Sequence, residues 1–362
     1  MRGTLQEITQ RPIMGLVPQP GESPMLREHE YHSLAVADVI YETADTRSFV
    51  IEVPSALEKT FAYVAGQFCT FRATIGGESV VRCYSMSSSP DTGDRLTVTV
   101  KRVSGGKMSN WMNDVLAPGD TIEVMRPAGR FVLRVAKVSI VAVVGGSGIT
   151  PVLSIIKTAL ATTTREIALV YANRDADSII FAGELERLRE TSDGRLSVHH
   201  HLDSEHGLLD AEACAALVGD RAHADFYVCG PGPYMDVVEA GLAQRGVAPS
   251  QVFIERFELP DVLSAVTEAS GRKSIVIRLD RRKHTIGYES GDTLLEAARR
   301  AGLKPPFSCQ VGSCASCMAY LEEGRATMRV NNALSAEEVE EGWVLTCQAI
   351  PVSGVVVVDY DR

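Results

Sequence analysis

The stretch Cys309-Gln-Val-Gly-Ser-Cys314-Ala-Ser-Cys317 contains three cysteines in the order C-x4-C-x2-C, and a fourth, Cys347, follows further along the chain. This is the ligand spacing of a plant-type [2Fe–2S] cluster. Zinc is the alternative, but zinc ligands more often come as two C-x2-C pairs, and this region has one such pair. The sequence therefore predicts that these four thiolates hold a [2Fe–2S] cluster, a group that carries one electron at a time.

The composition indicates a folded protein of more than one domain. The chain has 362 residues, of which 45% are hydrophobic and 23% charged, and its net charge is −10. The length suits several domains, and the acidic balance disfavours nucleic acid as a partner. The most apolar stretch, 136–160, is interrupted by Gly, Pro and Lys, so we expect no membrane span. The N-terminus lacks the apolar core of a secretory signal, so we expect the cytoplasm.

The pattern of apolar residues divides the chain into five segments. Residues 1–30 have no periodicity, and we expect a flexible leader. Short alternating runs separated by turns occupy residues 31–135 and predict a β-barrel. Strands alternating with helices over residues 136–256 predict a parallel sheet covered by helices. Residues 257–272 have weak pattern and predict a linker, whereas residues 273–362 combine a hairpin, a helix, the cysteine loop and closing strands.

A glycine-rich turn marks a candidate dinucleotide site. The sequence V-V-G-G-S-G-I-T-P at 143–151 follows an apolar strand and precedes a helix. Gly146 and Gly148 permit a tight turn near phosphates, and the N-terminus of the helix supplies free N–H groups. We expect Thr150 to cap this helix and Pro151 to take its first position.

The next strand of this region ends in Asn173-Arg174-Asp175, where the ribose of the dinucleotide is expected. Asp175 can serve a 2′-hydroxyl, and Arg174 can meet a 2′-phosphate. We predict that Asn173 and Arg174 contribute to cofactor binding. The sequence leaves the choice between NADH and NADPH open.

A third redox group is needed between these two sites. A nicotinamide delivers two electrons as hydride, whereas the cluster accepts one, and a flavin can divide the pair. The predicted barrel offers two candidate flavin-binding segments, Arg82-Cys83-Tyr84-Ser85 and Gly105-Gly106-Lys107-Met108-Ser109-Asn110-Trp111.

Four motifs together resemble those of the ferredoxin–NADP⁺ reductase superfamily. They are R-x-Y-S at 82–85, G-G-K-x-S-N-W at 105–111, G-G-S-G-I-T-P at 145–151 and Y-V-C-G-P-G-P-Y-M at 227–235. With the C-terminal cysteine motif, the chain resembles the reductase components of multicomponent oxygenases from about His32 to its C-terminus.

The resemblance implies a multidomain fold of α/β and β type. Its parts would be a Greek-key β-barrel flavin domain, a Rossmann-like nucleotide domain and a β-grasp ferredoxin domain. The implied cofactors are FAD, the [2Fe–2S] cluster and NADH, with NADPH as the alternative.

The resemblance also implies roles for individual residues in the flavin site. Arg82 would pair with the FAD pyrophosphate, Tyr84 would stack on the isoalloxazine ring, and Ser85 would lie near N5. The amides of one turn would hold the phosphates, namely those of Gly105, Gly106, Lys107, Met108 and Ser109.

A nicotinamide pocket is implied at the end of the Y-V-C-G-P-G-P-Y-M motif. It would involve Cys229, Gly230 and Pro231, with Glu255 and Phe257 near the flavin. The residues implied to act in catalysis are Ser85, Cys229 and Glu255.

We therefore expect an electron-transfer chain within one polypeptide, ending at the cluster bound by Cys309, Cys314, Cys317 and Cys347. The resemblance implies that the partner is a terminal oxygenase of the Rieske or diiron type. The alternatives are a reductase for another redox protein, such as a hybrid-cluster protein, and an electron-entry or regulatory subunit. We expect the chain to be a monomer.

Overall fold

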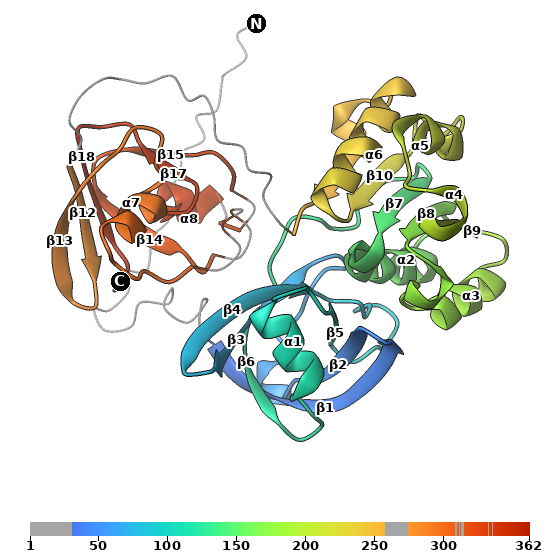
Figure 1. Cartoon of the computed structure of the whole chain (residues 1–362), viewed down its shortest axis with the longest axis horizontal. Helices are drawn as coiled ribbons and strands as arrows, with labels where there is room; N and C mark the ends of the chain where they lie inside the picture. The colour runs from blue at the N-terminus through green and yellow to red at the C-terminus, as the bar shows by residue number, and fades with distance from the viewer. Residues whose placement is uncertain are drawn as a thin grey trace, which may run out of the picture.

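The computed structural model describes residues 31–257, 274–307, 310, 312, 315–331, 333–334 and 336–362. Figure 1 shows three bodies that follow one another along the chain: a barrel, an α/β domain and a C-terminal domain built around a smaller sheet. The predicted fold class is confirmed. The predicted leader lies outside the described residues, as does the predicted linker apart from Phe257.

The first body is a six-stranded antiparallel sheet in the order β4-β3-β6-β1-β2-β5. A bridge between Met86 and Val98 joins the segment after β4 to β5 and closes the sheet into a barrel. Its elements are β1 (Tyr31–Thr43), β2 (Thr46–Glu52), η2 (Ser55–Leu57), β3 (Phe68–Ile75), β4 (Glu78–Ser85), β5 (Thr97–Lys101), α1 (Lys107–Asp114) and β6 (Thr121–Met125). Met108 and Met112 of α1 are buried with Phe49, Phe71 and Val124 in the barrel core, so this helix packs against the barrel interior.

The second body is a five-stranded parallel sheet in the order β11-β10-β7-β8-β9. Its strands are β7 (Ile140–Gly145), β8 (Ile167–Asn173), β9 (Leu196–Leu202), β10 (Asp225–Cys229) and β11 (Val252–Glu255). Its helices are η3 (Gly146–Gly148), α2 (Ile149–Thr162), η4 (Ala176–Ser178), α3 (Ala182–Thr191), α4 (Asp203–His206), α5 (Ala211–Val218), α6 (Gly232–Gln244) and η5 (Pro249–Gln251).

The central strand, β7, is apolar throughout because both of its faces are covered. All six residues of β7 are buried. Alternate residues of the strand belong to two hydrophobic clusters, one shared with α2 and α3 and the other shared with α5 and α6. A strand covered on both faces reads as a continuous apolar run. The strand order reverses at β7, which is the point where ligands bind in open α/β sheets.

The third body is a mixed sheet in the order β13-β12-β18-β14-β16, beside a small ladder of β15 and β17. Its elements are β12 (Ser274–Leu279), β13 (Arg282–Gly287), α7 (Leu294–Arg300), β14 (Met318–Glu323), β15 (Ala326–Met328), α8 (Ala336–Glu340), β16 (Trp343–Leu345), β17 (Ala349–Pro351) and β18 (Val355–Asp359). Helix α7 begins with a capping box between Thr293 and Glu296. Its residues Leu294, Ala297 and Ala298 pack on the sheet.

Helix α2 attaches the nucleotide-type domain to the barrel through buried hydroxyl groups. Ser154 Oγ donates to the carbonyl of Ser88 at 2.5 Å, and the hydroxyls of Ser89 and Thr158 lie 2.6 Å apart. Lys157 Nζ also lies 3.0 Å from Asp94 Oδ2. These contacts fix one domain against the other along the second and third turns of α2.

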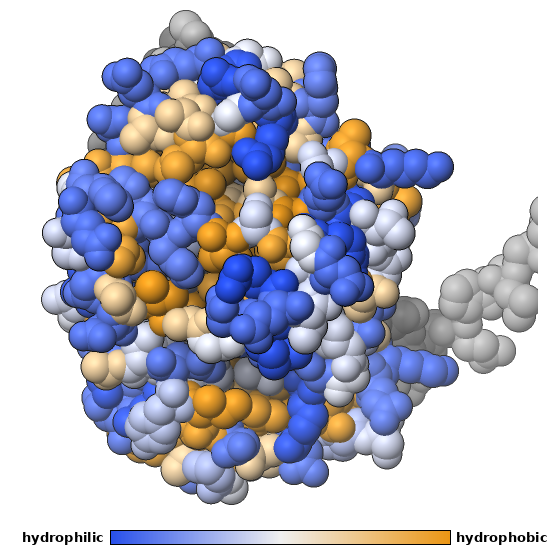
Figure 2. All heavy atoms as spheres, turned by 90° about the vertical axis from the view of Figure 1, so that its right-hand side faces the viewer, coloured by the Kyte–Doolittle hydropathy of each residue, from blue (hydrophilic) through white to orange (hydrophobic). Residues whose placement is uncertain are grey.

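None of the helices within the described residues is both long enough and apolar enough to cross a bilayer. Figure 2 shows polar side chains around smaller apolar areas on one face of the molecule.

A buried ion pair joins the loop before β8 to the first residue of β10, and its arginine also holds the segment that follows the barrel. Arg165 Nη2 lies 2.6 Å from Asp225 Oδ2, and the two side chains are 2% and 4% exposed. Arg165 also donates to the carbonyls of Val138 at 2.5 Å and Arg134 at 3.0 Å. The guanidinium therefore ties three segments of the chain together.

We expect Arg165→Met to destabilise the protein by about 3 kcal/mol or more, because it leaves the Asp225 carboxylate buried without its main partner. The measurement is the calorimetric unfolding transition. Arg187→Met, which removes an exposed i,i+3 pair with Glu184, serves as control and should cost less than about 1 kcal/mol. Equal costs for the two variants would contradict the assigned role of Arg165.

Candidate functional site

The glycine turn lies directly against the end of a neighbouring strand. Strand β7 ends at Gly145, and residues 146–148 form a 3-10 turn that continues into α2. Gly146 has a φ of +53°, a left-handed conformation. A Cβ on Gly148 would lie 2.1 Å from the carbonyl oxygen of Cys229, so only glycine allows this approach. The turn and the end of β10 therefore form one edge.

The predicted capping of α2 is wrong. The helix begins at Ile149 with Gly148 as its N-cap, and no side chain caps it. Thr150 is the second helical residue, and its Oγ1 donates to the carbonyl of Ser147 at 3.0 Å. Pro151 is the third, where a missing N–H removes no helical hydrogen bond. The cause is that the 3-10 turn enters the helix without an extended residue between them, and it leaves the first N–H groups of α2 without a side-chain cap.

The end of β8 carries the signature of a polar ligand site. Asn173 is 5% exposed, and neither its amide nitrogen nor its amide oxygen has a hydrogen-bond partner. Leaving buried polar atoms unpaired costs about 1–3 kcal/mol, which a nucleotide hydrogen-bonded to the amide would recover. The Tyr171 hydroxyl donates to the carbonyl of Gly146 at 3.0 Å and so links this strand to the glycine turn. The residues at this edge fit a dinucleotide.

The two charged residues after Asn173 differ in their surroundings. The Asp175 carboxylate accepts from the backbone N–H of Ser178 at 2.9 Å, within a capping box that begins η4. The Arg174 side chain is 71% exposed. Asp175 is thus engaged locally, whereas Arg174 extends from the sheet edge.

Strands β10 and β11 bring Cys229 and Glu255 together as parallel partners. Burial raises the pKa of the Cys229 thiol well above its ordinary value, and the nearby Glu255 charge adds to the effect. The thiol therefore stays protonated and is no thiolate nucleophile. Burial also raises the pKa of Glu255 to about 7, which lets this carboxyl exchange a proton near neutral pH.

The start of α6 completes this edge of the sheet. Pro231 is the N-cap of α6, and a Cβ on Gly230 would lie 2.8 Å from the Tyr234 ring. The Tyr234 hydroxyl donates to the carbonyl of Val144 at 3.0 Å, which closes the gap between β7 and α6. Phe257, just beyond β11, is 42% exposed.

Strand β4 carries the first predicted flavin segment. Arg82 is exposed, and its Nη1 donates to the carbonyl of Val81 at 2.7 Å. The Tyr84 ring packs at 5.8 Å, centroid to centroid, from Phe71, and burial raises the pKa of the Tyr84 hydroxyl. Ser85 is buried at the end of the strand.

The second predicted flavin segment lies beside the first. Gly105 has a φ of +70°, and Gly106 is the N-cap of α1, again without a side-chain cap. Lys107 Nζ lies 2.5 Å from Glu78 Oε2 at the start of β4. The Ser109 hydroxyl accepts from the backbone N–H of Val103 at 3.2 Å. Uncapped amides at the start of α1 and the exposed Arg82 guanidinium suit a bound pyrophosphate.

The Met108 side chain is fully buried in the barrel core. Only its backbone therefore remains for the predicted contact with phosphate.

Two of the four predicted cluster ligands belong to the described residues. Cys317 immediately precedes β14, Cys347 lies between β16 and β17, and both are buried. Thr346 donates to the carbonyl of Cys317 through its N–H at 3.1 Å and its hydroxyl at 2.7 Å, so the two ligand segments are tied together. Cys309 and Cys314 lie outside the described residues.

The described part of the cysteine loop is strongly curved. Gln310, Gly312 and Ala315 have φ values of +55°, +74° and +53°. A Cβ on Gly312 would lie 2.8 Å from the carbonyl oxygen of Val330, and Gln348 Nε2 donates to the carbonyl of Gln310 at 2.6 Å.

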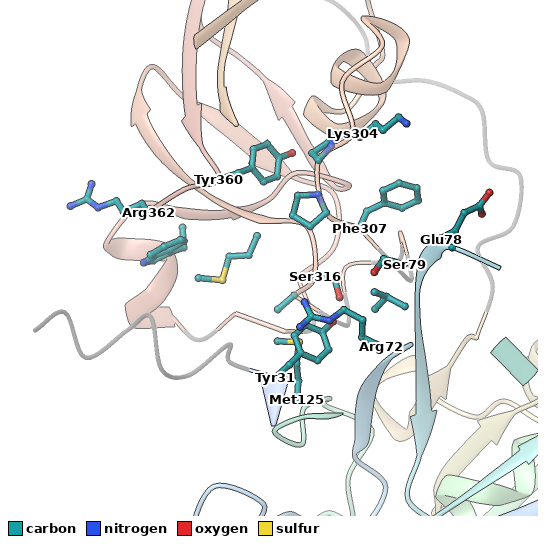
Figure 3. A pocket seen from close by; sticks show the side chains of 17 residues that line it. Tyr31, Arg72, Glu78, Ser79, Met125, Lys304, Phe307, Ser316, Tyr360 and Arg362 are labelled. Atoms are coloured by element: carbon teal, nitrogen blue, oxygen red, sulfur yellow. The ribbon is translucent and has the colours of Figure 1, made fainter. Parts of the chain in front are cut away.

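A cavity of about 800 Å³ separates this loop from the barrel. Figure 3 shows Phe307 and Ser316 of the C-terminal domain on one side and Glu78, Ser79 and Arg72 of β3 and β4 on the other. The Ser316 hydroxyl, which lines the cavity, is buried without a hydrogen-bond partner. The cysteine loop therefore faces the strand that carries the predicted flavin residues.

Two residues that shape these sites have no assigned role in the sequence prediction. Tyr234 closes the sheet edge, and Glu78 joins the two flavin segments. Tyr234 stands within a quoted motif, where an aromatic residue on the first turn of a helix was the available signal. Glu78 has no such signal, because its partner Lys107 lies 29 positions away. The sequence does name Asn173, but its burial becomes visible only in the structure.

Comparison with known proteins assigns a family model to each body. An oxidoreductase FAD-binding domain matches residues 33–133, an oxidoreductase NAD-binding domain matches residues 142–240, and a 2Fe-2S iron-sulfur cluster binding domain matches residues 277–352.

Similar proteins match over nearly their whole lengths. The chain is 40% identical to the ferredoxin reductase component of 3-ketosteroid-9-alpha-monooxygenase from Mycolicibacterium smegmatis, covering 91% of this chain and 97% of that protein. It is 34% identical to a component of the 1,2-phenylacetyl-CoA epoxidase from Escherichia coli, covering 91% and 98%. Among solved structures, phthalate dioxygenase reductase is similar with a TM-score of 0.57 and 26% identity, covering 91% of this chain and 98% of that one.

We expect the protonation of Glu255 to make stability depend on pH. Its folded pKa of about 7 exceeds the ordinary value of 4.5, so its contribution is fully present below about pH 4.5 and is lost as pH rises through 7. The difference in melting temperature between the wild type and Glu255→Gln should therefore become less favourable to the wild type as the pH is raised from about 5 to about 8. Glu58→Gln, at an exposed position, is the control. A difference that does not change with pH would refute the raised pKa.

Proposed function

Because the chain belongs to the family of oxygenase reductase components with FAD-binding, NAD-binding and 2Fe-2S domains, we propose that it passes electrons from a reduced nicotinamide dinucleotide to a separate terminal oxygenase. The observation that carries the proposal is the placement of the cysteine loop across a cavity from β4. The dinucleotide edge belongs to the domain that α2 holds against the same barrel. When bound, the flavin accepts a hydride and releases single electrons, and the cluster carries them one at a time.

The residues of the dinucleotide edge would bind and orient the donor. The backbone N–H groups of the glycine turn at 146–148, which begins the helical segment, would receive the pyrophosphate, and the unpaired Asn173 amide would hydrogen-bond to the nucleotide. The hydroxyl contacts between α2 and residues 88–89 hold this edge against the barrel. Positioning of the reacting groups is the main contribution such a site makes to hydride transfer.

The residues of the barrel would hold the flavin. Arg82 and the amides of residues 105–109 would bind its phosphates, and the Tyr84 ring would lie along its aromatic system. Glu255, with a pKa of about 7, would hold or release a proton at its carboxyl group. Cys229 would contribute a neutral, protonated thiol to the nicotinamide pocket.

The four cysteines Cys309, Cys314, Cys317 and Cys347 would hold the cluster. A Rieske or diiron oxygenase is the partner that we propose, since the similar proteins are components of a monooxygenase and an epoxidase. The identity of the final substrate would then reside in that partner. We propose that the chain works in the cytoplasm, because cysteines that serve as cluster ligands persist in reducing surroundings; we further propose that it is a monomer.

We expect Cys314→Ser to separate the two halves of the reaction. Oxidation of NADH with a dye that accepts electrons at the flavin should continue, because that site lies in other domains. Reduction of cytochrome c, used as a one-electron acceptor, should fall to background together with labile sulfide content. Cys214→Ala, a buried position on α5, is the matched control and should keep both activities.

Three outcomes would contradict the proposal. Full cytochrome c reduction by the Cys314 variant would refute the electron order. Zinc without labile sulfide in the wild-type protein would refute the cluster. Absence of steady NADH and NADPH oxidation would favour an electron-entry or regulatory role over an enzyme.

A further inference from the structure

The turn between β1 and β2 of the barrel reaches the carboxyl end of β8. Asp45, in this turn, has its Oδ2 3.7 Å from Nη2 of Arg174. The two residues lie far apart in the sequence and belong to different domains. An acidic side chain of the barrel is therefore next to the residue that follows Asn173, where the ribose of a dinucleotide is expected.

The Asp45 carboxylate is held in place by its own neighbours. Its Oδ1 accepts from the hydroxyls of Thr43 at 2.9 Å and Thr46 at 3.0 Å. Lys101 Nζ lies 3.7 Å from Oδ2, and the Asp45 carbonyl accepts from the N–H of Arg102 at 2.8 Å. A carboxylate with these contacts does not simply swing away when another anion approaches Arg174.

Arg174 is the cation at this edge that a 2′-phosphate would meet. Its side chain is 71% exposed, and its backbone carbonyl accepts from the N–H of Ser204 in α4 at 2.9 Å, which fixes its backbone beside that helix. Asp175 is engaged in the cap of η4 and leaves the outward position to Arg174. In NADPH-binding sites, an arginine at this place accommodates the 2′-phosphate.

We propose that Asp45 determines the choice of nicotinamide cofactor, by engaging Arg174 and placing a negative charge where a 2′-phosphate would approach. NADH, which carries a 2′-hydroxyl there, meets no such repulsion. The residue that favours NADH is therefore Asp45 of the barrel. It is not an acidic residue at the end of β8, where the ribose-binding acid is usually found. This inference rests on the proposed function and deepens it.

The charges around the pair set the direction of the effect. Among the described residues, Lys101 and Arg174 are the cations within 4.0 Å of the Asp45 carboxylate. Neutralising Asp45 leaves both cations without their shared anion, so a doubly charged phosphate gains attraction and loses repulsion at once. Because Arg174 is exposed, the gain should weaken as salt is added.

The test compares kcat and KM for NADH and NADPH with a dye that accepts electrons at the flavin, in full-length protein. The wild type should favour NADH. Asp45→Asn should raise kcat/KM for NADPH about tenfold, mainly through a lower KM, and change the value for NADH less than about threefold. Adding Arg174→Ala should abolish the gain. Binding of NADP⁺, followed by titration calorimetry, should tighten in the Asp45 variant in the same proportion.

Asp114→Asn is the matched control, because it removes the acidic partner of Arg102, 2.6 Å away on the same barrel, and should leave the cofactor ratio unchanged. A wild type that prefers NADPH would overturn the inference, as would an Asp45 variant whose two cofactors change equally. Loss of the cofactor preference in the Asp114 variant would also count against it. A wild type that oxidises neither cofactor refutes the proposed function itself, an outcome separate from any change in ratio.

Discussion

Helix α2 is the element on which the arrangement of the sites depends. Its first turn emerges from the glycine turn that approaches Cys229, and its second and third turns are bonded to residues 88 and 89 of the barrel. These hydroxyl contacts are buried, so breaking one would leave polar groups unpaired. A helix is stiff over this length, and the same rigid body therefore carries the dinucleotide edge and anchors it. The helix therefore helps to set the distance between the predicted dinucleotide and flavin sites.

The C-terminal domain meets the barrel in a different way. Among the described residues, Arg130 Nη1 donates to the carbonyl of Asn331 at 3.0 Å, and a cavity of about 800 Å³ lies between the two bodies. Contact with the barrel is thus more open here than at α2. An open junction beside the cysteine loop is compatible with a group that takes electrons on one side and delivers them on another.

Local sequence patterns predicted the parts that depend on neighbours in the chain. The cysteine spacing, the strand before Gly145 and the helix after it can be read from short stretches, because turn geometry and helix initiation are local. Thr150 was assigned wrongly because a 3-10 turn replaced the expected extended residue before α2. The motif at 105–111 predicted that Met108 contacts phosphate, but it could not indicate that the Met108 side chain is part of the barrel core.

The sequence alone determined the chemistry available to this protein: four thiolates at cluster spacing, a glycine turn before a helix, and two segments suited to a flavin. Apart from Cys347, each depends on residues close together in the chain. Only the tertiary structure decided how these sites face one another and which charges surround them. The burial of Glu255, the unpaired amide of Asn173 and the approach of Asp45 to Arg174 all arise where separate domains or strands meet. Burial and electrostatic interactions depend on distances in space, and these distances cannot be read from the separation of residues along the chain.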